Sequence, residues 1–163
     1  MIKEIIQKGS PILRKKCDLV TDFNNSRNVI QDMLDTIKHI KKTYDFSRGI
    51  GLAASQIGEL IRIAIIESKR NHYIMINPEI IEHSDEKHNV WEGCLSFFQY
   101  RAYVPRYTSV KVKYYNQEGH EKFIECEGDL AASLQHEIDH LDGIIYVDRL
   151  KNGDADLILS DKA

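Results

Sequence analysis

The sequence contains little cysteine and no long apolar run. Its three cysteines, Cys17, Cys94 and Cys126, are odd in number and far apart, which argues against a disulfide framework. No stretch approaches the ~20 apolar residues that a membrane-spanning helix needs, and early charges leave no apolar core for a secretory signal. We therefore expect no membrane segment and a reducing compartment. That compartment is the cytoplasm or, for a mature form, an organellar stroma or matrix.

A strong charge of one sign is also missing. The 22 Lys and Arg residues and 25 Asp and Glu residues give a net charge of −3, and the longest basic run is Arg14-Lys15-Lys16. Nucleic-acid binding needs a concentrated positive surface, so we expect no direct contact with nucleic acid. An apolar content of 42% and a charged content of 29% are typical of globular proteins. A length of 163 residues fits one catalytic domain, residues 1–163.

What the chain does contain is a group of ligand residues near its C-terminal end. Residues 135–140 read Gln-His-Glu-Ile-Asp-His, within a segment whose apolar spacing predicts a helix. On a helix, positions i and i+4 lie about 40° apart around the axis, so His136 and His140 can bind one metal ion. Glu137 lies about 100° from His136, where it can exchange a proton with a water that the metal activates.

The same short pattern also arises by chance on amphipathic helices, so a third ligand must decide. A zincin peptidase would supply that ligand downstream, but the expected His position holds Tyr146, and no His, Glu or Cys follows Leu141. The ligand should therefore lie upstream. Cys94 is the candidate, because two His and one Cys leave a fourth position for water, as in a catalytic site.

Helices are predicted towards both ends of the chain, with strands between them. The expected helices are residues 11–16, with Ser10 as N-cap, 28–44 and 130–142, and the expected strands are residues 61–66, 72–76, 108–116, 120–127 and 144–147. More extended chain is expected within residues 79–91, around a polar turn. Asp129 is the expected N-cap of the last helix and Gly143 its C-terminal stop. This order predicts an α+β fold.

Gly49-Ile50-Gly51 predicts backbone that either approaches another group closely or takes a positive φ. A phosphate-binding loop is disfavoured because no Lys-Ser or Lys-Thr follows. A tight turn into a short helix fits equally well, and the sequence leaves both readings open. Farther along, the amide of Gln56 can donate a hydrogen bond to a developing oxyanion. Cys17 and Cys126 we interpret as small apolar residues.

Three motifs stand in one order: Gly49-x-Gly-Leu-Ala-Ala-x-Gln56, Glu92-Gly-Cys-Leu-Ser96 and Gln135-His-Glu-x-Asp-His-Leu141. Together they resemble the signature motifs of the peptide deformylase family. The likeness extends to residues 9–14, 76–78 and 147–150, and so spans nearly the whole chain. It implies a peptide-deformylase-like α+β fold, in which antiparallel sheets surround a central helix that carries His-Glu-x-x-His.

The resemblance also implies an activity. Members are metal-dependent amide hydrolases that remove the formyl group from the N-terminal formyl-methionine of nascent polypeptides and release formate. Cys94, His136 and His140 would hold one divalent metal ion, Fe(II) in cells, which Zn, Ni or Co can replace. The partners would be N-formylmethionyl peptides and, transiently, the ribosome, although the tail after Leu150 lacks the basic helix of some bacterial members.

Further roles follow from matching positions. Glu137 would act as general base and then general acid, while Gln56 and the backbone N–H of Leu95 would stabilise the oxyanion. The substrate would contact a set of matching positions: Gly49, Ile50, Gly51, Glu92, Gly93, Arg101, Ala132 and Ser133. At Gly51 and Gly93 a side chain would obstruct the substrate backbone.

The chain departs from the family pattern near the expected substrate pocket. Phe97-Phe98-Gln99-Tyr100 replaces a segment that usually contains Pro, and Asp129, Ala132 and Ser133 stand where bulkier or more apolar residues are common. These changes leave the metal chemistry intact and put the preferred first side chain of the substrate in doubt. Two alternatives remain: a related amidase that acts on another N-acyl peptide, and an inactive metal-binding deformylase-like protein.

Overall fold

The structure is a computed structural model, which describes residues 1–46 and 48–160. Its α-helices are α1 (Ser26–Thr43) and α2 (Gly128–Leu141). Its strands are β1 (Ile50–Ala53), β2 (Ile63–Glu67), β3 (His72–His83), β4 (Lys87–Gly93), β5 (Tyr100–Tyr107), β6 (Ser109–Tyr115), β7 (Glu121–Glu127) and β8 (Ile158–Leu159). Short 3-10 helices span Pro11–Arg14, Ala54–Ile57, Leu95–Phe97, Tyr146–Arg149 and Gly153–Asp156.

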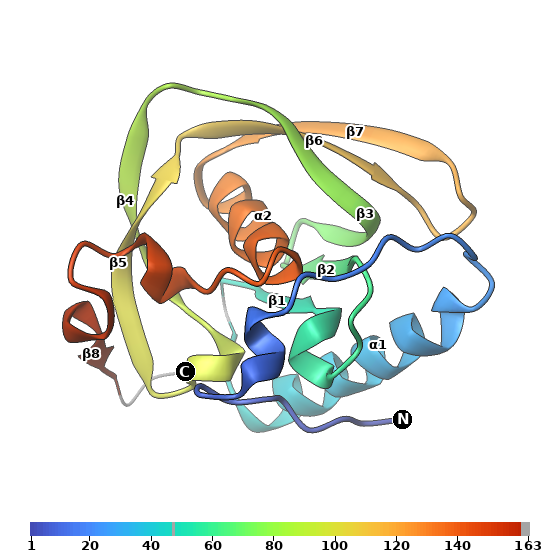
Figure 1. Cartoon of the computed structure of the whole chain (residues 1–163), viewed down its shortest axis with the longest axis horizontal. Helices are drawn as coiled ribbons and strands as arrows, with labels where there is room; N and C mark the ends of the chain where they lie inside the picture. Colours follow the sequence, from blue (N-terminus) through green and yellow to red (C-terminus); the bar gives the residue numbers. More distant parts are fainter. Residues whose placement is uncertain (47, 161–163) are drawn as a thin grey trace.

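The strands form two antiparallel sheets around α2. One sheet has the order β1-β2-β3-β6-β7 and the other the order β4-β5-β8. β3 is long enough to pair with β2 through its first half and with β6 through its second half, so the larger sheet folds over the helix. Figure 1 shows α2 between β1 and β2 on one side and β6 and β7 on the other. The predicted fold, antiparallel sheets around a central helix, is confirmed.

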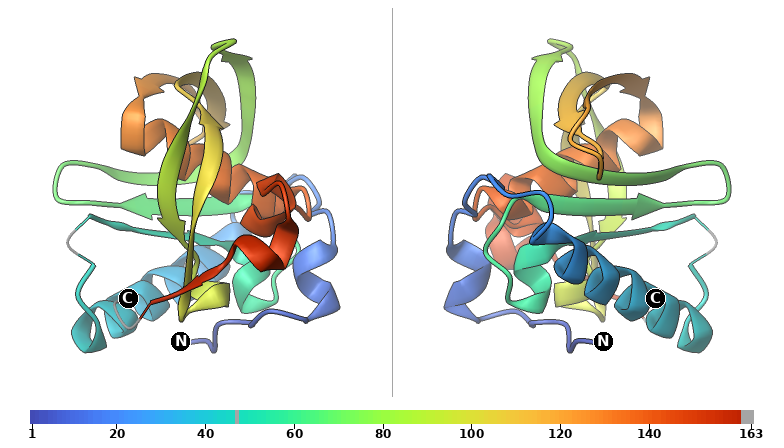
Figure 2. Two further views of the ribbon diagram at one scale, coloured as in Figure 1. Left: turned by 90° about the vertical axis from the view of Figure 1, so that its left-hand side faces the viewer. Right: turned by 90° about the vertical axis from the view of Figure 1, so that its right-hand side faces the viewer.

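β2 contacts both α-helices, because buried side chains project from both of its faces. Ile63 and Ile65 pack in a cluster with the buried face of α1, whereas Ile66 packs with the apolar residues of α2. Successive side chains of a strand point to opposite faces, which is why one strand can serve both helices. α1 therefore covers the face of β1 and β2 opposite α2, as the side views show (Figure 2).

Asn77 fixes a bend in β3. Among the described residues, Asn77 is the one non-glycine residue with a positive φ, which is 52°. It directly precedes Pro78, at the point where the register between β3 and β6 shifts. Its side chain accepts a hydrogen bond from the N–H of Val20 at 2.8 Å and donates one to the carbonyl of Val20 at 2.9 Å. These bonds stabilise an otherwise costly conformation and tie the loop before α1 to the sheet.

Several predicted boundaries need correction. The strand expected at residues 144–147 is absent; Tyr146–Arg149 is a 3-10 helix, because Asp148 accepts a hydrogen bond from the N–H of Ile145 at 2.9 Å and consecutive residues are buried on one side. α2 begins at Gly128 with Glu127 as N-cap, so Asp129 lies in its first turn. The first predicted helix is only the 3-10 turn Pro11–Arg14.

Other predictions hold. Ser10 caps the 3-10 helix through its hydroxyl, and Gly143 follows α2 with a φ of 74°. Cys17 is buried, and Cys126 is half-buried rather than fully enclosed. Within residues 1–46 and 48–160, no helix has both the length and the apolar character needed to cross a bilayer.

Candidate active site

α2 brings both of its histidines to one point of β4. His136 and His140 lie one helical turn apart, and Cys94 follows directly after β4. The Sγ of Cys94 lies 3.3 Å from Nε2 of His140, and one ligand atom from each of the three residues lies within 4.8 Å of the others. All three side chains are buried. The three predicted metal ligands are therefore close enough to share one ion.

The chemistry of this cluster fits a divalent cation. Burial lowers the pKa of His140 well below its usual value, so its imidazole is neutral, which is the form that binds metals. Burial would also lower the pKa of His136, but the neighbouring Cys94 and Glu92 raise it instead. The negative groups that favour a proton on His136 also favour a metal cation at the same place. Binding of a metal ion would release that proton.

Behind His136 lies a buried ion-pair network. Nδ1 of His136 lies 2.7 Å from Oε1 of Glu92, and Arg106 donates to both carboxylate oxygens of Glu92 at 2.7 and 2.9 Å. Arg106 also donates to Asp139 at 2.9 Å, and Arg149 donates to the same carboxylate at 2.8 and 3.1 Å. Arg106 and His136 lower the pKa of Glu92 against the effect of its burial. A carboxylate at Nδ1 orients the ring and leaves Nε2 for a metal.

Glu137 lies next to the cluster and faces β1. Its Oε2 is buried and forms no hydrogen bond with the protein atoms described. Burial raises the pKa of this carboxyl to about 7, and the negative charge of Glu92 acts in the same direction. A carboxyl with a pKa near 7 can both take and return a proton at neutral pH.

Two glycines make room for charged side chains. A Cβ atom at Gly51 would overlap the carboxylate of Glu137, and one at Gly93 would overlap the guanidinium of Arg101. The sequence suggested close approach of a substrate at both positions; the structure supplies these protein neighbours as a reason for glycine. At Gly49 the φ is 116°, which favours glycine for its backbone conformation.

The donor groups expected at an oxyanion lie on the other side of Cys94. Oε1 of Gln56 accepts from the N–H of Ala53 at 2.9 Å, which fixes the orientation of the amide. Its Nε2 consequently points at Ser96 Oγ, at 3.1 Å, and lies 3.6 Å from Cys94 Sγ. Leu95 begins the 3-10 helix after the cysteine and lines the same pocket.

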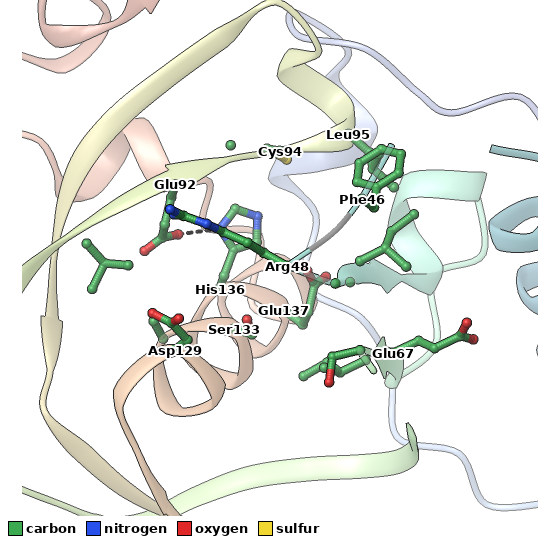
Figure 3. Close-up of a pocket in the computed structure, with 18 of the residues that line it drawn as sticks. Phe46, Arg48, Glu67, Glu92, Cys94, Leu95, Asp129, Ser133, His136 and Glu137 are labelled. Carbon is green, nitrogen blue, oxygen red and sulfur yellow. Dashed lines mark hydrogen bonds and ion pairs between the residues drawn. The ribbon is translucent and has the colours of Figure 1, made fainter. Parts of the chain in front are cut away.

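The pocket in front of the cluster has a volume of about 520 Å³. It lies between the edge strands β1 and β4, with α2 as one wall, and every predicted catalytic, metal-binding and substrate-binding residue except His140 lines it. Figure 3 shows His136, Glu137 and Ser133 projecting from α2 towards the pocket, with Cys94 and Leu95 on the opposite side. Glu92 reaches the pocket, but Arg106 and His136 occupy its carboxylate.

The aromatic side chains of residues 97–100 divide between core and pocket. Phe97 is buried against Tyr146, with ring centroids 5.1 Å apart, whereas Phe98 lines the pocket and contacts the ring of Tyr44 at 4.6 Å. Sequence reasoning missed Arg106 altogether. It also missed that Arg48 lines the pocket, whereas Asp129 was noted only as a departure from the family pattern nearby. The available signal was that two of the motifs carry a further acid, Glu92 and Asp139, and these are the two carboxylates that Arg106 pairs with.

Comparison with known proteins decides the family. A family model described as polypeptide deformylase matches residues 2–156. The chain belongs to the peptide deformylase family. It is 42% identical to a peptide deformylase of Heliobacterium modesticaldum over 152 residues, which cover 93% of this chain and 95% of that protein. A peptide deformylase of Natranaerobius thermophilus is also 42% identical, over 91% of this chain and 92% of its own length.

Solved structures of deformylases share the fold. The peptide deformylase of Thermotoga maritima superposes with a TM-score of 0.84 at 36% identity, covering 93% of this chain and 99% of its own. A complex of the Synechococcus elongatus peptide deformylase with actinonin gives a TM-score of 0.83 at 31% identity, covering 92% and 79%. Peptide deformylases are metal-dependent enzymes that remove formyl groups from nascent peptides, and this chain carries a candidate metal site.

Proposed function

We propose that this chain hydrolyses the formyl group from N-formylmethionyl peptides, with Cys94, His136 and His140 holding one divalent metal ion. The observation that carries this proposal is the cluster of the three ligand atoms within 4.8 Å, beside a buried carboxylate and an open pocket. When bound, the ion would supply a Lewis acid and lower the pKa of a water molecule. We further propose that residues 1–163 act as one catalytic domain.

Glu137 moves the proton in this proposal. Its Oε2 has no hydrogen-bond partner among the described protein atoms, so it is available to accept a proton from the attacking water. The same carboxyl then gives that proton to the amine as formate leaves. A pKa of about 7, caused chiefly by burial, keeps both directions accessible at neutral pH.

The oxyanion that forms on the formyl carbon is stabilised by donors at the opposite wall. Nε2 of Gln56 is held towards Cys94 because its Oε1 is fixed by the N–H of Ala53. The backbone N–H of Leu95 supplies the second donor. Preorganised donors of this kind contribute on the order of 10²- to 10³-fold in rate each. Glu92 and Arg106 act as positioning residues, because they hold the ring of His136.

The peptide lies between two strand edges. β1 and β4 each end their sheet, so their free backbone groups can pair with an extended chain. The residues that contact it in this proposal are Gly49, Ile50, Gly51, Gly93 and Arg101 from the strands and the nearby loop, and Ala132 and Ser133 from α2. The first side chain then lies against Ala132 and Ser133, next to His136.

We propose Fe(II) as the working metal, with Zn, Ni and Co as replacements, as the likeness to deformylases implies; a ligand set of one Cys and two His suits all four ions. A substrate that exists only during protein synthesis places the enzyme in the cytoplasm or an organellar matrix, near ribosomes. Iron beside a thiolate is open to oxidation, so iron-loaded enzyme should lose activity in air faster than nickel-loaded enzyme.

Formate release from formyl-Met-Ala-Ser tests the proposal, with protein loaded anaerobically with Fe(II) or with Ni(II). One metal per chain and formate release by both forms are expected. Acetyl-Met-Ala-Ser is the control for the alternative amidase, and Cys94→Ala for the site. Wild-type metal content and activity in Cys94→Ala would refute the ligand assignment, and turnover of the acetyl peptide alone would favour the other amidase.

A further inference from the structure

Asp129, in the first turn of α2, lines the pocket and has no ion-pair partner among the described residues. Asp129, Ser133 and His136 are spaced by four and three residues, so they share one face of the helix, and all three line the pocket. Figure 3 shows Ser133 between the other two on this face. At a rise of about 1.5 Å per residue, Asp129 lies about 6 Å from Ser133 along the helix, on the side away from the candidate metal site.

The carboxylate of Asp129 lacks the ion pair that two other acids of the pocket have. Glu92 is paired with Arg106, and Glu67 with Lys41. Asp129 is exposed and has no ion pair or hydrogen bond with any side chain in residues 1–46 and 48–160. Asp45 lines the pocket too, but on the loop before β1 and not on the α2 face. Asp129 thus presents an exposed carboxylate, without an ion-pair partner among the described residues, beside the expected path of the peptide.

The repeat of an extended peptide matches this spacing. A strand rises about 3.3 Å per residue and alternates its side chains, so the first and third side chains share a face about 7 Å apart. If the first side chain lies against Ala132 and Ser133, as proposed above, and the chain continues towards the start of α2, the third side chain lies beside Asp129. The second side chain faces away from the helix.

We propose that Asp129 is a specificity-determining residue that favours formyl peptides with a cationic side chain at the third position. The inference rests on the proposed function and adds a selection among its substrates. An exposed pair of opposite charges contributes little energy, so a preference of about two- to fivefold in kcat/KM is expected. The preference should fall towards one at about 1 M salt, because screening then acts within about 3 Å.

A purely structural role for Asp129 makes a different prediction. An acid in the first turn of a helix is stabilised by the helix dipole, so its removal would lower thermal stability and leave the choice of substrate unchanged. Glu127 provides a matched control, because it is an exposed acid at the same end of α2 that does not line the pocket.

The experiment compares kcat/KM for formyl-Met-Ala-Lys, formyl-Met-Ala-norleucine and formyl-Met-Lys-Ala, with the nickel-loaded protein at low and high salt. Wild type, Asp129→Asn and Glu127→Gln are measured in parallel, with thermal unfolding of each. We expect the preference for Lys over norleucine at position three in wild type and Glu127→Gln, and its loss in Asp129→Asn. Formyl-Met-Lys-Ala should gain little from its lysine.

Three outcomes would overturn the inference. The Lys-to-norleucine ratio could be one in the wild type, could persist in Asp129→Asn, or could be as large with Lys at position two. In each of these cases formyl-Met-Ala-norleucine is still hydrolysed, so the proposed function stands while the inference fails. No formate from any of the three peptides would refute both.

Discussion

The carboxylate of Glu137 occupies the space that a side chain at Gly51 would need. β1 has an ordinary extended backbone at this position, because Gly51 is not among the glycines with positive φ. An alanine there would consequently leave the strand intact and press on the carboxyl of Glu137. Because position 51 has no Cβ, the carboxylate of Glu137, the proposed proton carrier, can lie directly against β1, the strand that is expected to contact the substrate.

Gly51→Ala should therefore impair the chemistry without unfolding the protein. Displacing a catalytic group by about 1 Å can cost on the order of 100-fold, so we expect a fall in kcat of at least about tenfold. Steady-state kinetics with formyl-Met-Ala-Ser, together with metal content and thermal unfolding, would measure this. An unchanged kcat would mean that Glu137 moves aside without consequence.

Glu137→Gln keeps the shape of the side chain and removes its proton transfer. Turnover should fall by about 10²- to 10⁴-fold, while the metal content stays near that of the wild type. The ligand cluster is not altered by the substitution, so metal analysis serves as the control. Turnover near the wild-type rate would exclude Glu137 as the general base.

The raised pKa of Glu137 also affects the stability of metal-free protein. The carboxyl has a pKa of about 7 in the fold and about 4.5 when unfolded. Between these values only the folded state keeps the proton. The stability that this proton contributes is present below the unfolded pKa and is lost as the pH rises through about 7, amounting to about 3 kcal/mol. Denaturation of chelator-treated wild type and Glu137→Gln at about pH 5 and about pH 8 should show a smaller decline in the variant.

Arg106→Met should destabilise the protein strongly. Arg106 is 2% exposed and is paired with both Glu92 and Asp139, so its loss removes the buried cation that the two carboxylates share. Removing one member of a buried pair costs about 3–5 kcal/mol. Arg149→Met is the matched control, because the Arg149 side chain is 42% exposed and an exposed pair contributes less than about 1 kcal/mol. Equal denaturation midpoints for the two variants would contradict this view of the network.

Larger side chains on the α2 wall of the pocket should change which first side chain of the substrate is preferred. Ala132 and Ser133 line it with small groups, which predicts weak discrimination among formyl peptides that begin with Met, norleucine, Phe or Leu. In Ala132→Ile and Ser133→Cys the discrimination should sharpen, since one methylene of mismatch is worth about 1–3 kcal/mol. Values of kcat/KM for the four substrates test this. A strong preference for Met that neither substitution alters would show that these positions do not shape the pocket.

The sequence predicted those helices and ligand residues whose positions follow from patterns of neighbouring residues. The spacing of apolar residues predicted α1 and α2, and the position of Cys94 before the helix motif indicated the ligand cluster. Arg106 could not be found in this way, because its partners Glu92 and Asp139 lie 14 and 33 residues away in the chain. The run at residues 144–147 was misassigned because its apolar side chains suit a strand, whereas a local hydrogen bond from the N–H of Ile145 to the carboxylate of Asp148 selects a helical turn.

The order of the ligands along the chain has a consequence for synthesis. Cys94 leaves the ribosome well before His136 and His140, which are added 42 and 46 residues later. At about 5–20 residues per second this interval lasts roughly 2–9 s, during which the thiol has neither imidazole beside it. A newborn chain thus exposes the thiol of Cys94 to oxidants before the proposed metal site can form. Translational pauses between these positions would raise the fraction of molecules that never acquire a metal.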